Sequence, residues 1–266
     1  MGKLDGKVAI VTGAGRGIGR AIAEAYLQEG AAVTITAARE QSEIDQIAQQ
    51  DWSERVLALL ADVTNPEACE QVVAQTIQRF GHIDILVNNA GRGMKYVSSS
   101  FLTEPTRFWD VAPETWHMIM ETNVNGPFYM TRATVQHMLE RGNGGSIIGI
   151  GASYETMTRR GFSPYGPSKA ALEAALAIWA QELSETGIRV NILLPGGATN
   201  TGMVPAETPA DVQARFLQPE IMQAPAVFLA SDSSLGITGR RVMATEWSME
   251  NPQGRAIIEG INTRKG

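Results

Sequence analysis

The sequence predicts an α/β fold in which one parallel sheet is covered by helices on both faces. Short apolar runs rich in β-branched residues alternate along the chain with longer runs whose apolar residues recur at helical spacing. Several of the apolar runs end at glycine, asparagine or aspartate, as buried strands that border a ligand site do. We find no repeat of fixed period and no linker, so we expect residues 1–266 to form a single domain.

The first unit is a strand, a glycine-rich turn and a helix. The strand is predicted at KVAIVTG, the turn at GAGRGIG, and the helix ends at Gly30. Glycines let a backbone approach a pyrophosphate, and a helix N-terminus offers unpaired N–H groups and a favourable dipole. We therefore expect this turn to bind a dinucleotide cofactor through Gly13, Gly17, Ile18 and Gly19.

The second strand, AAVTITAAR, ends where such a fold chooses between nicotinamide cofactors. An acidic side chain there binds a ribose 2′-hydroxyl, whereas an arginine accepts a 2′-phosphate. Ala37 and Ala38 occupy the turn, Arg39 follows, and Arg16 stands in the glycine-rich turn. The pattern predicts NADP, with NAD as the alternative.

The third and fourth strands are predicted at ERVLALLADV and HIDILVNNAG, separated by a helix over residues 66–80. We expect Asp62 to meet an adenine edge and Val63, Asn89, Ala90 and Gly91 to border the cofactor. Strands that alternate with helices of this length imply a doubly wound, seven-stranded parallel sheet of the Rossmann type, with ligands beyond the carboxyl ends of the strands.

Two irregular segments, at about 92–111 and 204–218, have no readable motif. Each is either a surface excursion or a wall of a substrate site. Between them, a long helix is predicted over residues 114–139, with Asn123 in its middle. Asparagine is a poor helix former, so it either breaks a turn for function or points to solvent.

Tyr165 and Lys169 stand four residues apart after the fifth strand, GGSIIGI. Pro167 is tolerated only in a first helical turn, so the helix begins close to Tyr165 and both side chains lie on one face. A neighbouring ammonium and a helix N-terminus both favour a phenolate. We therefore expect the pKa of Tyr165 to be lowered and the residue to serve as a general acid/base.

The sixth strand leads to a Pro195–Gly196 turn, and the seventh is predicted at GRRVMAT. The tail from Glu246 has little periodicity, and we expect it to reach across an oligomer interface. A net charge of -6 argues against a general nucleic-acid or anionic-membrane binder. No apolar run reaches the length of a membrane span, and Cys69 and the three histidines have no metal-ligand spacing. We expect a cytoplasmic protein without a metal.

Over nearly its whole length the chain resembles the classical short-chain dehydrogenase/reductase family. The motifs that carry the resemblance are TGAGRGIG, Asp62-Val63, NNAG, the asparagine of NVNGPF, YGPSK and RVNILLPG. The resemblance implies NAD(P)-dependent oxidoreduction and a homotetramer, or a homodimer, with an interface formed by the helices carrying Asn123 and Tyr165.

The family's roles map onto this chain as expectations. Tyr165 exchanges a proton with the substrate oxygen, Lys169 holds the nicotinamide ribose and lowers the Tyr165 pKa, and Asn123 positions a water. Pro195, Gly196 and Thr201 contact the nicotinamide, with Thr199 as the alternative to Thr201. The resemblance places the catalytic serine thirteen residues before the tyrosine, which is Ala152 here. Either Ser153 is the donor to the substrate oxygen, which we favour, or that hydrogen bond is missing.

The favoured function is an NADP-dependent dehydrogenase or reductase of a small polar or cyclic alcohol or ketone. Sugar or polyol oxidoreductases and 3-oxoacyl reductases are alternatives within the family, and an NADP-binding sensor or scaffold without turnover is the alternative outside it. Arg159 and Arg160 either attract an anionic substrate or form a solvated turn.

Overall fold

The computed structural model describes residues 2–49 and 52–257. Its strands are β1 (Val8–Val11), β2 (Ala32–Ala37), β3 (Val56–Leu60), β4 (Ile85–Asn88), β5 (Gly145–Ile150), β6 (Ile188–Leu194), β7 (Arg240–Met243) and β8 (Arg255–Ala256). Its α-helices are α1 (Gly17–Gln28), α2 (Gln41–Ala48), α3 (Pro66–Phe80), α4 (Pro113–Met120), α5 (Gly126–Arg141), α6 (Tyr154–Met157), α7 (Tyr165–Glu182), α8 (Ala210–Gln213) and α9 (Gln223–Ala230).

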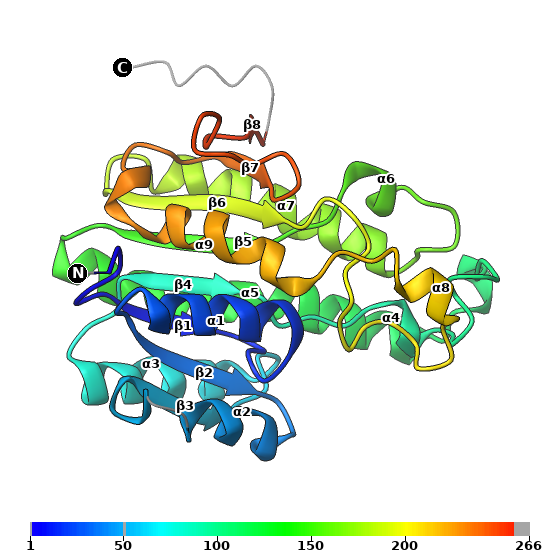
Figure 1. The fold of residues 1–266 in the computed structure, drawn as a ribbon, viewed down its shortest axis with the longest axis horizontal. Coiled ribbons are helices and arrows are strands. Elements are labelled where there is room, and N and C mark those ends of the chain that lie inside the picture. Colours follow the sequence, from blue (N-terminus) through cyan, green and yellow to red (C-terminus); the bar gives the residue numbers. More distant parts are fainter. Residues whose placement is uncertain (1, 50–51, 258–266) are drawn as a thin grey trace.

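The strands form one sheet in the order β3-β2-β1-β4-β5-β6-β7-β8 (Figure 1). The seven strands from β3 to β7 pair in parallel, which confirms the predicted doubly wound sheet. The prediction of seven strands omits β8, a two-residue strand that pairs antiparallel with β7. Because the strand order reverses between β1 and β4, the sheet opens a crevice at their carboxyl ends.

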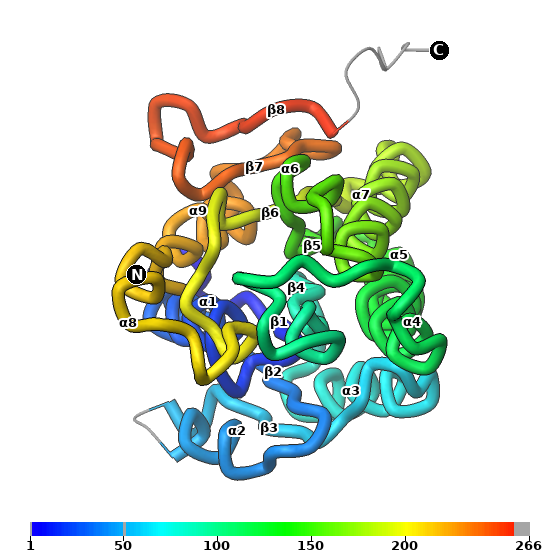
Figure 2. Tube along the Cα trace, turned by 90° about the vertical axis from the view of Figure 1, so that its right-hand side faces the viewer, coloured from blue at the N-terminus to red at the C-terminus, as the bar shows by residue number. Residues whose placement is uncertain are grey.

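Helices cover both faces of the sheet (Figure 2). One hydrophobic core lies between the sheet and α1, α2 and α9, and includes Ile22, Ile44 and Phe228. The other lies between the sheet and α3, α5 and α7, and includes Met130 and Leu172. Successive strand residues alternate between the two cores, so the strands are apolar on both faces, as the uninterrupted apolar runs predict.

The predicted helix over residues 114–139 is three elements rather than one. Between α4 and α5 lies a five-residue π-helical turn, Glu121–Asn125, which includes Asn123. Pro127 stands in the first turn of α5, where its missing N–H and its ring would disturb a continuous α-helix. Such π-helical turns recur at functional sites.

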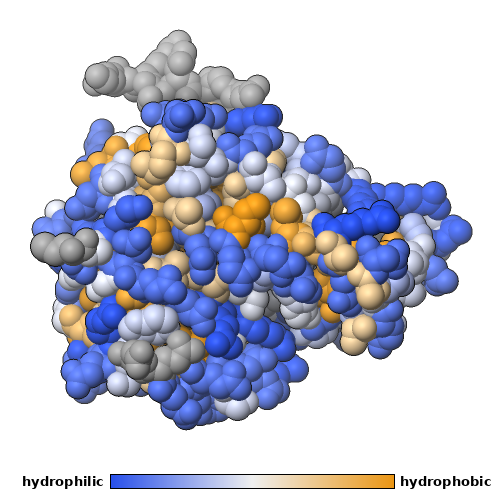
Figure 3. Space-filling view, viewed as in Figure 1, coloured by the Kyte–Doolittle hydropathy of each residue, from blue (hydrophilic) through white to orange (hydrophobic). Residues whose placement is uncertain are grey.

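Residues 246–257, the described part of the tail, contain more regular structure than the sequence indicates. This part includes β8, and Trp247 packs against Phe228 of α9 with ring centroids 5.9 Å apart. Residues 258–266 lie outside the described residues, so a role of the tail in an oligomer stays a prediction. Among the described helices, none combines the length and the apolarity needed to cross a membrane. On the face shown in Figure 3, hydrophilic side chains predominate and the hydrophobic ones form separate patches.

Candidate active site

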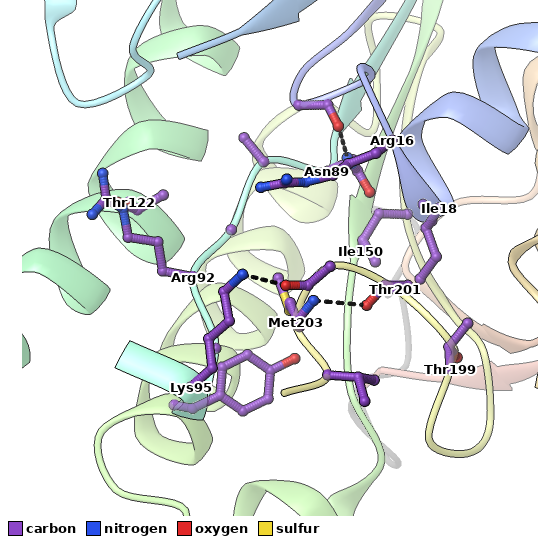
Figure 4. Close-up of a pocket in the computed structure, with 18 of the residues that line it drawn as sticks. Arg16, Ile18, Asn89, Arg92, Lys95, Thr122, Ile150, Thr199, Thr201 and Met203 are labelled. Atoms are coloured by element: carbon purple, nitrogen blue, oxygen red, sulfur yellow. Dashed lines mark hydrogen bonds between the residues drawn. The ribbon is translucent and has the colours of Figure 1, made fainter. Parts of the chain in front are cut away.

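A cavity of about 710 Å³ lies at the carboxyl ends of the strands. The loops after β1, β2, β3, β4, β5 and β6 all contribute to its wall. Figure 2 views the molecule from this side, and Figure 4 shows some of the lining side chains. The site residues expected from the sequence that line it are Gly13, Arg16, Gly17, Ile18, Arg39, Asp62, Val63, Asn89, Ala90, Gly91, Ser153, Tyr165, Lys169, Pro195, Gly196 and Thr201. Gly19 and Asn123 lie behind this wall.

The glycine-rich turn leaves no room for side chains. A Cβ added at Gly13 would lie 2.9 Å from the Cα of Ala90, and one at Gly19 would lie 2.3 Å from Asn89 Nδ2. Gly13 and Gly17 also have positive φ values, 63° and 57°, which L side chains rarely adopt. No side chain caps the N-terminus of α1. The turn therefore fits a pyrophosphate, because bare backbone and uncapped N–H groups border the cavity.

Asn89 and Thr12 join the loops after β1 and β4. Asn89 Nδ2 donates to the carbonyls of Thr12 at 2.8 Å and Gly13 at 2.9 Å, as Figure 4 shows for one of these bonds. The Thr12 hydroxyl accepts the N–H groups of Asn89 and Ala90, each at 3.0 Å. The structure thus assigns Asn89 to holding the glycine-rich turn in place. The sequence did not predict this role of the Thr12 hydroxyl. Thr12 is the first residue of the TGAGRGIG motif, and nothing else in the sequence marks it.

The end of β2 has both basic and acidic side chains. Arg39 and Glu40 line the cavity there, and Arg16 Nη1 lies 3.0 Å from Glu43 Oε1. Arg16 and Arg39 therefore both line the cavity near the end of β2, where the sequence predicts a 2′-phosphate site. Arg16 is paired there with the Glu43 carboxylate. Glu43 was missed because it stands inside α2, whose register relative to the glycine-rich turn only the fold defines.

Asp62 borders the cavity two residues beyond the end of β3. Its Oδ1 accepts hydrogen bonds from the N–H of Thr64 at 3.0 Å and from the Thr64 hydroxyl at 2.9 Å. These bonds fix the carboxylate in a turn that starts α3. Next to it, Val63 is buried, and its methyl group would lie 2.7 Å from a Cβ on Gly126, so only glycine fits at the start of α5.

Tyr165 is the first residue of α7, as the position of Pro167 predicts. The Lys169 ammonium lies 5.9 Å from the centre of the Tyr165 ring and donates to the carbonyl of Ile150 at 2.8 Å. Burial raises the pKa of the Tyr165 phenol to about 12 and lowers the pKa of the Lys169 ammonium to about 8. The predicted lowering of the Tyr165 pKa is therefore wrong for the chain on its own, because burial removes the hydration that a phenolate needs.

Asn123 points inward from the π-helical turn, and its side chain is completely buried. Its Oδ1 accepts the N–H of Arg92 at 2.7 Å, and its Nδ2 donates to the Arg92 carbonyl and to the Ser168 hydroxyl, each at 2.9 Å. The sequence left two alternatives for Asn123, a break in the helix or a side chain that points to solvent. The break is confirmed, because Asn123 lies in a π-helical turn and is buried. The side chain ties the loop after β4 to α7, one residue before Lys169.

Ser153 lies at the turn between β5 and α6. Its Oγ caps α6 by accepting the N–H of Thr156 at 3.2 Å, and it lies 3.1 Å from the Thr156 hydroxyl. Both Ala152 and Ser153 line the cavity that contains Tyr165. The Ser153 hydroxyl therefore has a fixed direction at the cavity wall, while the Ala152 position offers no hydroxyl.

The loop after β6 crosses the glycine-rich turn. A Cβ added at Gly17 would lie 3.3 Å from Thr201, and one at Gly202 would lie 2.9 Å from Arg16 Nε. Thr199 and Thr201 both line the cavity, so both alternatives for the carboxamide contact remain. The Thr201 hydroxyl accepts the N–H of Met203 at 3.3 Å, as Figure 4 shows.

The segment 92–111 and the segment before α7 meet at one end of the cavity. The Thr106 hydroxyl donates to the Gly161 carbonyl at 2.9 Å, and Phe101 packs edge-on against Phe162. Arg159 lines the cavity, whereas Arg160 does not. In the segment 204–218, Val204 and Phe216 line the cavity.

A buried ion pair that sequence reasoning missed lies beside Ser153. Arg241 Nε is 3.0 Å from Glu173 Oε1, and both side chains are almost fully buried. Among the described residues, no group of three or more histidine, cysteine, aspartate or glutamate side chains is arranged to hold a metal ion.

Comparisons with known proteins agree on one family. The family model described as short chain dehydrogenase matches residues 7–211. The chain is 30% identical to an L-rhamnose-1-dehydrogenase of Scheffersomyces stipitis, over 91% of this chain and 95% of that protein. It is 35% identical to the 3-oxoacyl-[acyl-carrier-protein] reductase of Vibrio cholerae, over 89% of this chain and 94% of that protein.

Among solved structures, the chain is similar to one described as a putative short-chain alcohol dehydrogenase from Sinorhizobium meliloti. The TM-score is 0.79 and the identity 32%, over 91% of this chain and 95% of that chain. With the family model matched over most of the chain and the cavity at the expected strand ends, the protein belongs to the short-chain dehydrogenase/reductase family, whose members are NAD(P)-dependent oxidoreductases of alcohol and carbonyl groups.

Proposed function

We propose that this oxidoreductase uses NADP and interconverts a small ketone and its secondary alcohol, with Tyr165 as general acid/base. The observation that carries the proposal is the single cavity that joins a side-chain-free glycine-rich turn to Tyr165 and Lys169. Arg16 and Arg39 at the end of β2 support NADP, because guanidinium groups match a phosphate in charge and geometry.

The residues divide the work of ketone reduction. Bound nicotinamide supplies the hydride that adds to the carbonyl carbon. Tyr165 gives its proton to the carbonyl oxygen, and its raised pKa keeps that proton in place at neutral pH. Ser153 donates a hydrogen bond to the same oxygen, and Lys169 holds the nicotinamide ribose and stabilises the phenolate that the transfer leaves.

Asn123 supports this arrangement from behind the cavity wall. Both hydrogens of its side-chain amide are used inside the protein, on Arg92 and Ser168. Its proposed task of positioning a water next to Lys169 therefore falls to its main chain. The segments 92–111 and 204–218 are proposed as substrate walls within one domain of 266 residues.

The substrate class stays open between two groups named by the relatives, sugars such as rhamnose and 3-oxoacyl thioesters. We also propose a cytoplasmic homotetramer, or homodimer, in which α5 and α7 form the interface. Phe128 and Ile178 on these helices are large apolar side chains that are 47% and 52% exposed, which favours a partner surface there.

The test is reductase activity with NADPH and with NADH on a panel of carbonyl compounds that includes small ketones, an aldose-derived lactone and a 3-oxoacyl thioester. Tyr165→Phe is expected to lower kcat by about 10³-fold and Ser153→Ala by about 10²-fold. Activity that survives Tyr165→Phe would contradict the proposed chemistry.

A second candidate function is an NADP-binding sensor or scaffold without turnover, which the alanine at position 152 favours. Tight NADPH binding together with no activity on any ketone of the panel is the result expected for that candidate.

A further inference from the structure

Two further inferences follow, and each rests on the proposed function for its physiological meaning. The first concerns the end of the cavity formed by the segments 92–111 and 153–162. The charged side chains that line this end are Arg92, Lys95 and Arg159, and no carboxylate joins them. The acidic side chains that line the cavity, Glu40, Glu43 and Asp62, all lie near the ends of β2 and β3.

This distribution of charge differs from that of the whole chain, in which 28 acidic residues exceed 22 lysines and arginines. Within the described residues, none of the three cations at this end forms an ion pair. All three lie over aromatic rings instead: Arg159 lies 4.8 Å from the centre of the Phe162 ring, and Arg92 and Lys95 lie 5.3 Å and 5.4 Å from that of Tyr96. Such stacking orients a cation and leaves its charge uncompensated.

The three cationic side chains point in different directions, and Figure 4 shows two of them, Arg92 and Lys95. Arg92 turns toward Thr122, whereas Lys95 reaches over the cavity and donates to the Gly202 carbonyl. Arg159 lines the cavity from the segment before α7 and lies over the ring of Phe162, which packs against Phe101 of the segment 92–111. We propose that Arg159, assisted by Lys95, binds an anionic group of the substrate, a carboxylate or a phosphate monoester.

Binding of small anions tests this site without turnover. The probes are benzoate and phenyl phosphate, with benzamide as the neutral molecule of similar shape, titrated calorimetrically into the full chain with and without NADPH. We expect one anion to bind at least about tenfold more tightly than benzamide, and Arg159→Gln to abolish that preference. Arg160→Gln is the matched control, since Arg160 does not line the cavity.

The proposed site would be contradicted if neither anion showed saturable binding, or if the anions bound no more tightly than benzamide. It would also be contradicted if Arg159→Gln and Arg160→Gln changed anion binding equally. The two anionic probes distinguish a carboxylate site from a phosphate site. Anion preference combined with no ketone turnover would leave the site standing and remove the proposed function.

The second inference concerns Arg241 of β7, which lies beside the Ser153 turn. Its Nη2 donates to the Ala152 carbonyl at 2.5 Å, and its guanidinium lies 4.1 Å from the centre of the Tyr154 ring. One guanidinium therefore contacts both neighbours of Ser153. The same group is paired with Glu173 of α7 at 3.0 Å, eight residues after Tyr165.

The pair joins two parts of the active site. Arg241 holds the turn that contains Ser153, and Glu173 fixes Arg241 relative to the helix that contains Tyr165. Both side chains are buried, so neither can turn away without leaving the charge of the other buried and unpaired. We infer that Arg241 is a positioning residue that aims the Ser153 hydroxyl at the oxygen on which Tyr165 acts.

A double-mutant cycle on ketone reduction tests this role. We expect Arg241→Met to lower kcat about tenfold or more without changing NADPH affinity, and to have no further effect in a Ser153→Ala background. Arg241→Lys keeps a cation for Glu173 and is expected to restore part of kcat. Arg240→Met is the control, because Arg240 is the preceding residue on β7 and contacts Gln253 at the surface.

If removal of one partner prevents folding, Arg241→Met combined with Glu173→Met leaves no unpaired buried charge and serves in the same cycle. Independent, multiplicative effects of the Arg241 and Ser153 variants would overturn the positioning role alone. An unchanged kcat in Ser153→Ala would instead remove Ser153 as donor, and the positioning role with it.

Discussion

Lys169 lies one helical turn after Tyr165, with its ammonium 5.9 Å from the centre of the phenol ring, and it donates to the carbonyl of Ile150. Burial moves the two pKa values apart, down to about 8 for the lysine and up to about 12 for the tyrosine. The chain thus holds an amine that loses its proton more readily than usual beside a phenol that keeps its proton.

The free energy of unfolding should depend on pH through Lys169. Its pKa is lowered from 10.5 to about 8, so between these values the unfolded chain binds the proton that the folded chain has released. Raising the pH through this window should therefore stabilise the wild type relative to Lys169→Met, by on the order of 3 kcal/mol. Urea denaturation of both proteins at the two pH limits measures this difference, and a constant difference would contradict it.

Tyr165 should stay protonated in the cofactor-free protein until the solution is strongly alkaline. Its pKa of about 12 lies above the ordinary value of 10.0 because the phenolate would be poorly solvated. The phenolate absorbance of wild type minus that of Tyr165→Phe should show no ionisation between pH 6 and about 10. Ionisation of Tyr165 near neutral pH would contradict this prediction and would show that the Lys169 ammonium affects the Tyr165 pKa more than burial does.

Asn123→Ala should destabilise the protein strongly. The substitution leaves the N–H and the carbonyl of Arg92 without their partner, each in a partly buried position. Unsatisfied groups of this kind cost about 1–3 kcal/mol each, so we expect a loss of about 2–5 kcal/mol in urea denaturation. Asn125→Ala, in the same π-helical turn, is the control, and it should change the stability by less than about 1 kcal/mol.

Gly19→Ala should weaken cofactor binding although Gly19 does not line the cavity. The added methyl group would lie 2.3 Å from Asn89 Nδ2 and 2.5 Å from the Gly13 carbonyl, so the amide must leave its position. We expect an affinity for NADPH at least about tenfold lower, since the phosphate-binding turn loses its support. Fluorescence titration measures it, and unchanged affinity would show that Asn89 is not required.

Glu43→Gln should strengthen binding of NADPH but not of NADH. The carboxylate lies 3.0 Å from Arg16 and competes with a 2′-phosphate for that guanidinium. Because Arg16 is 58% exposed, the expected gain is modest, about two- to fivefold in affinity for NADPH. Equal effects on the two cofactors would show that Arg16 does not contact the 2′ position.

The sequence predicted those parts of the fold and site that depend on local pattern. Uninterrupted apolar runs gave the parallel strands, Pro167 gave the start of α7, and the turn glycines gave the phosphate loop. The break at Asn123 was foreseen as one of two alternatives, because asparagine is unfavourable in a helix interior.

What the sequence did not reveal depends on contacts between distant segments. Arg241 and Glu173 are 68 residues apart, and neither stands in a motif. A lone glutamate within the apolar run AALEAALAIWA was the available signal, since a buried carboxylate needs a partner. The direction of the Tyr165 pKa shift was misjudged for a related reason: spacing gives the neighbouring charge but not the burial that opposes it.

The loop after β6 touches the glycine-rich turn through Thr201 and the loop after β4 through Met203, whose Sδ would lie 3.2 Å from a Cβ on Gly93. One loop thus lies against both the glycine-rich turn and the loop after β4, and residues of all three line the cavity. Because one loop contacts both walls of the cavity, we expect a substitution in this loop to affect the binding of nucleotide and of ketone together.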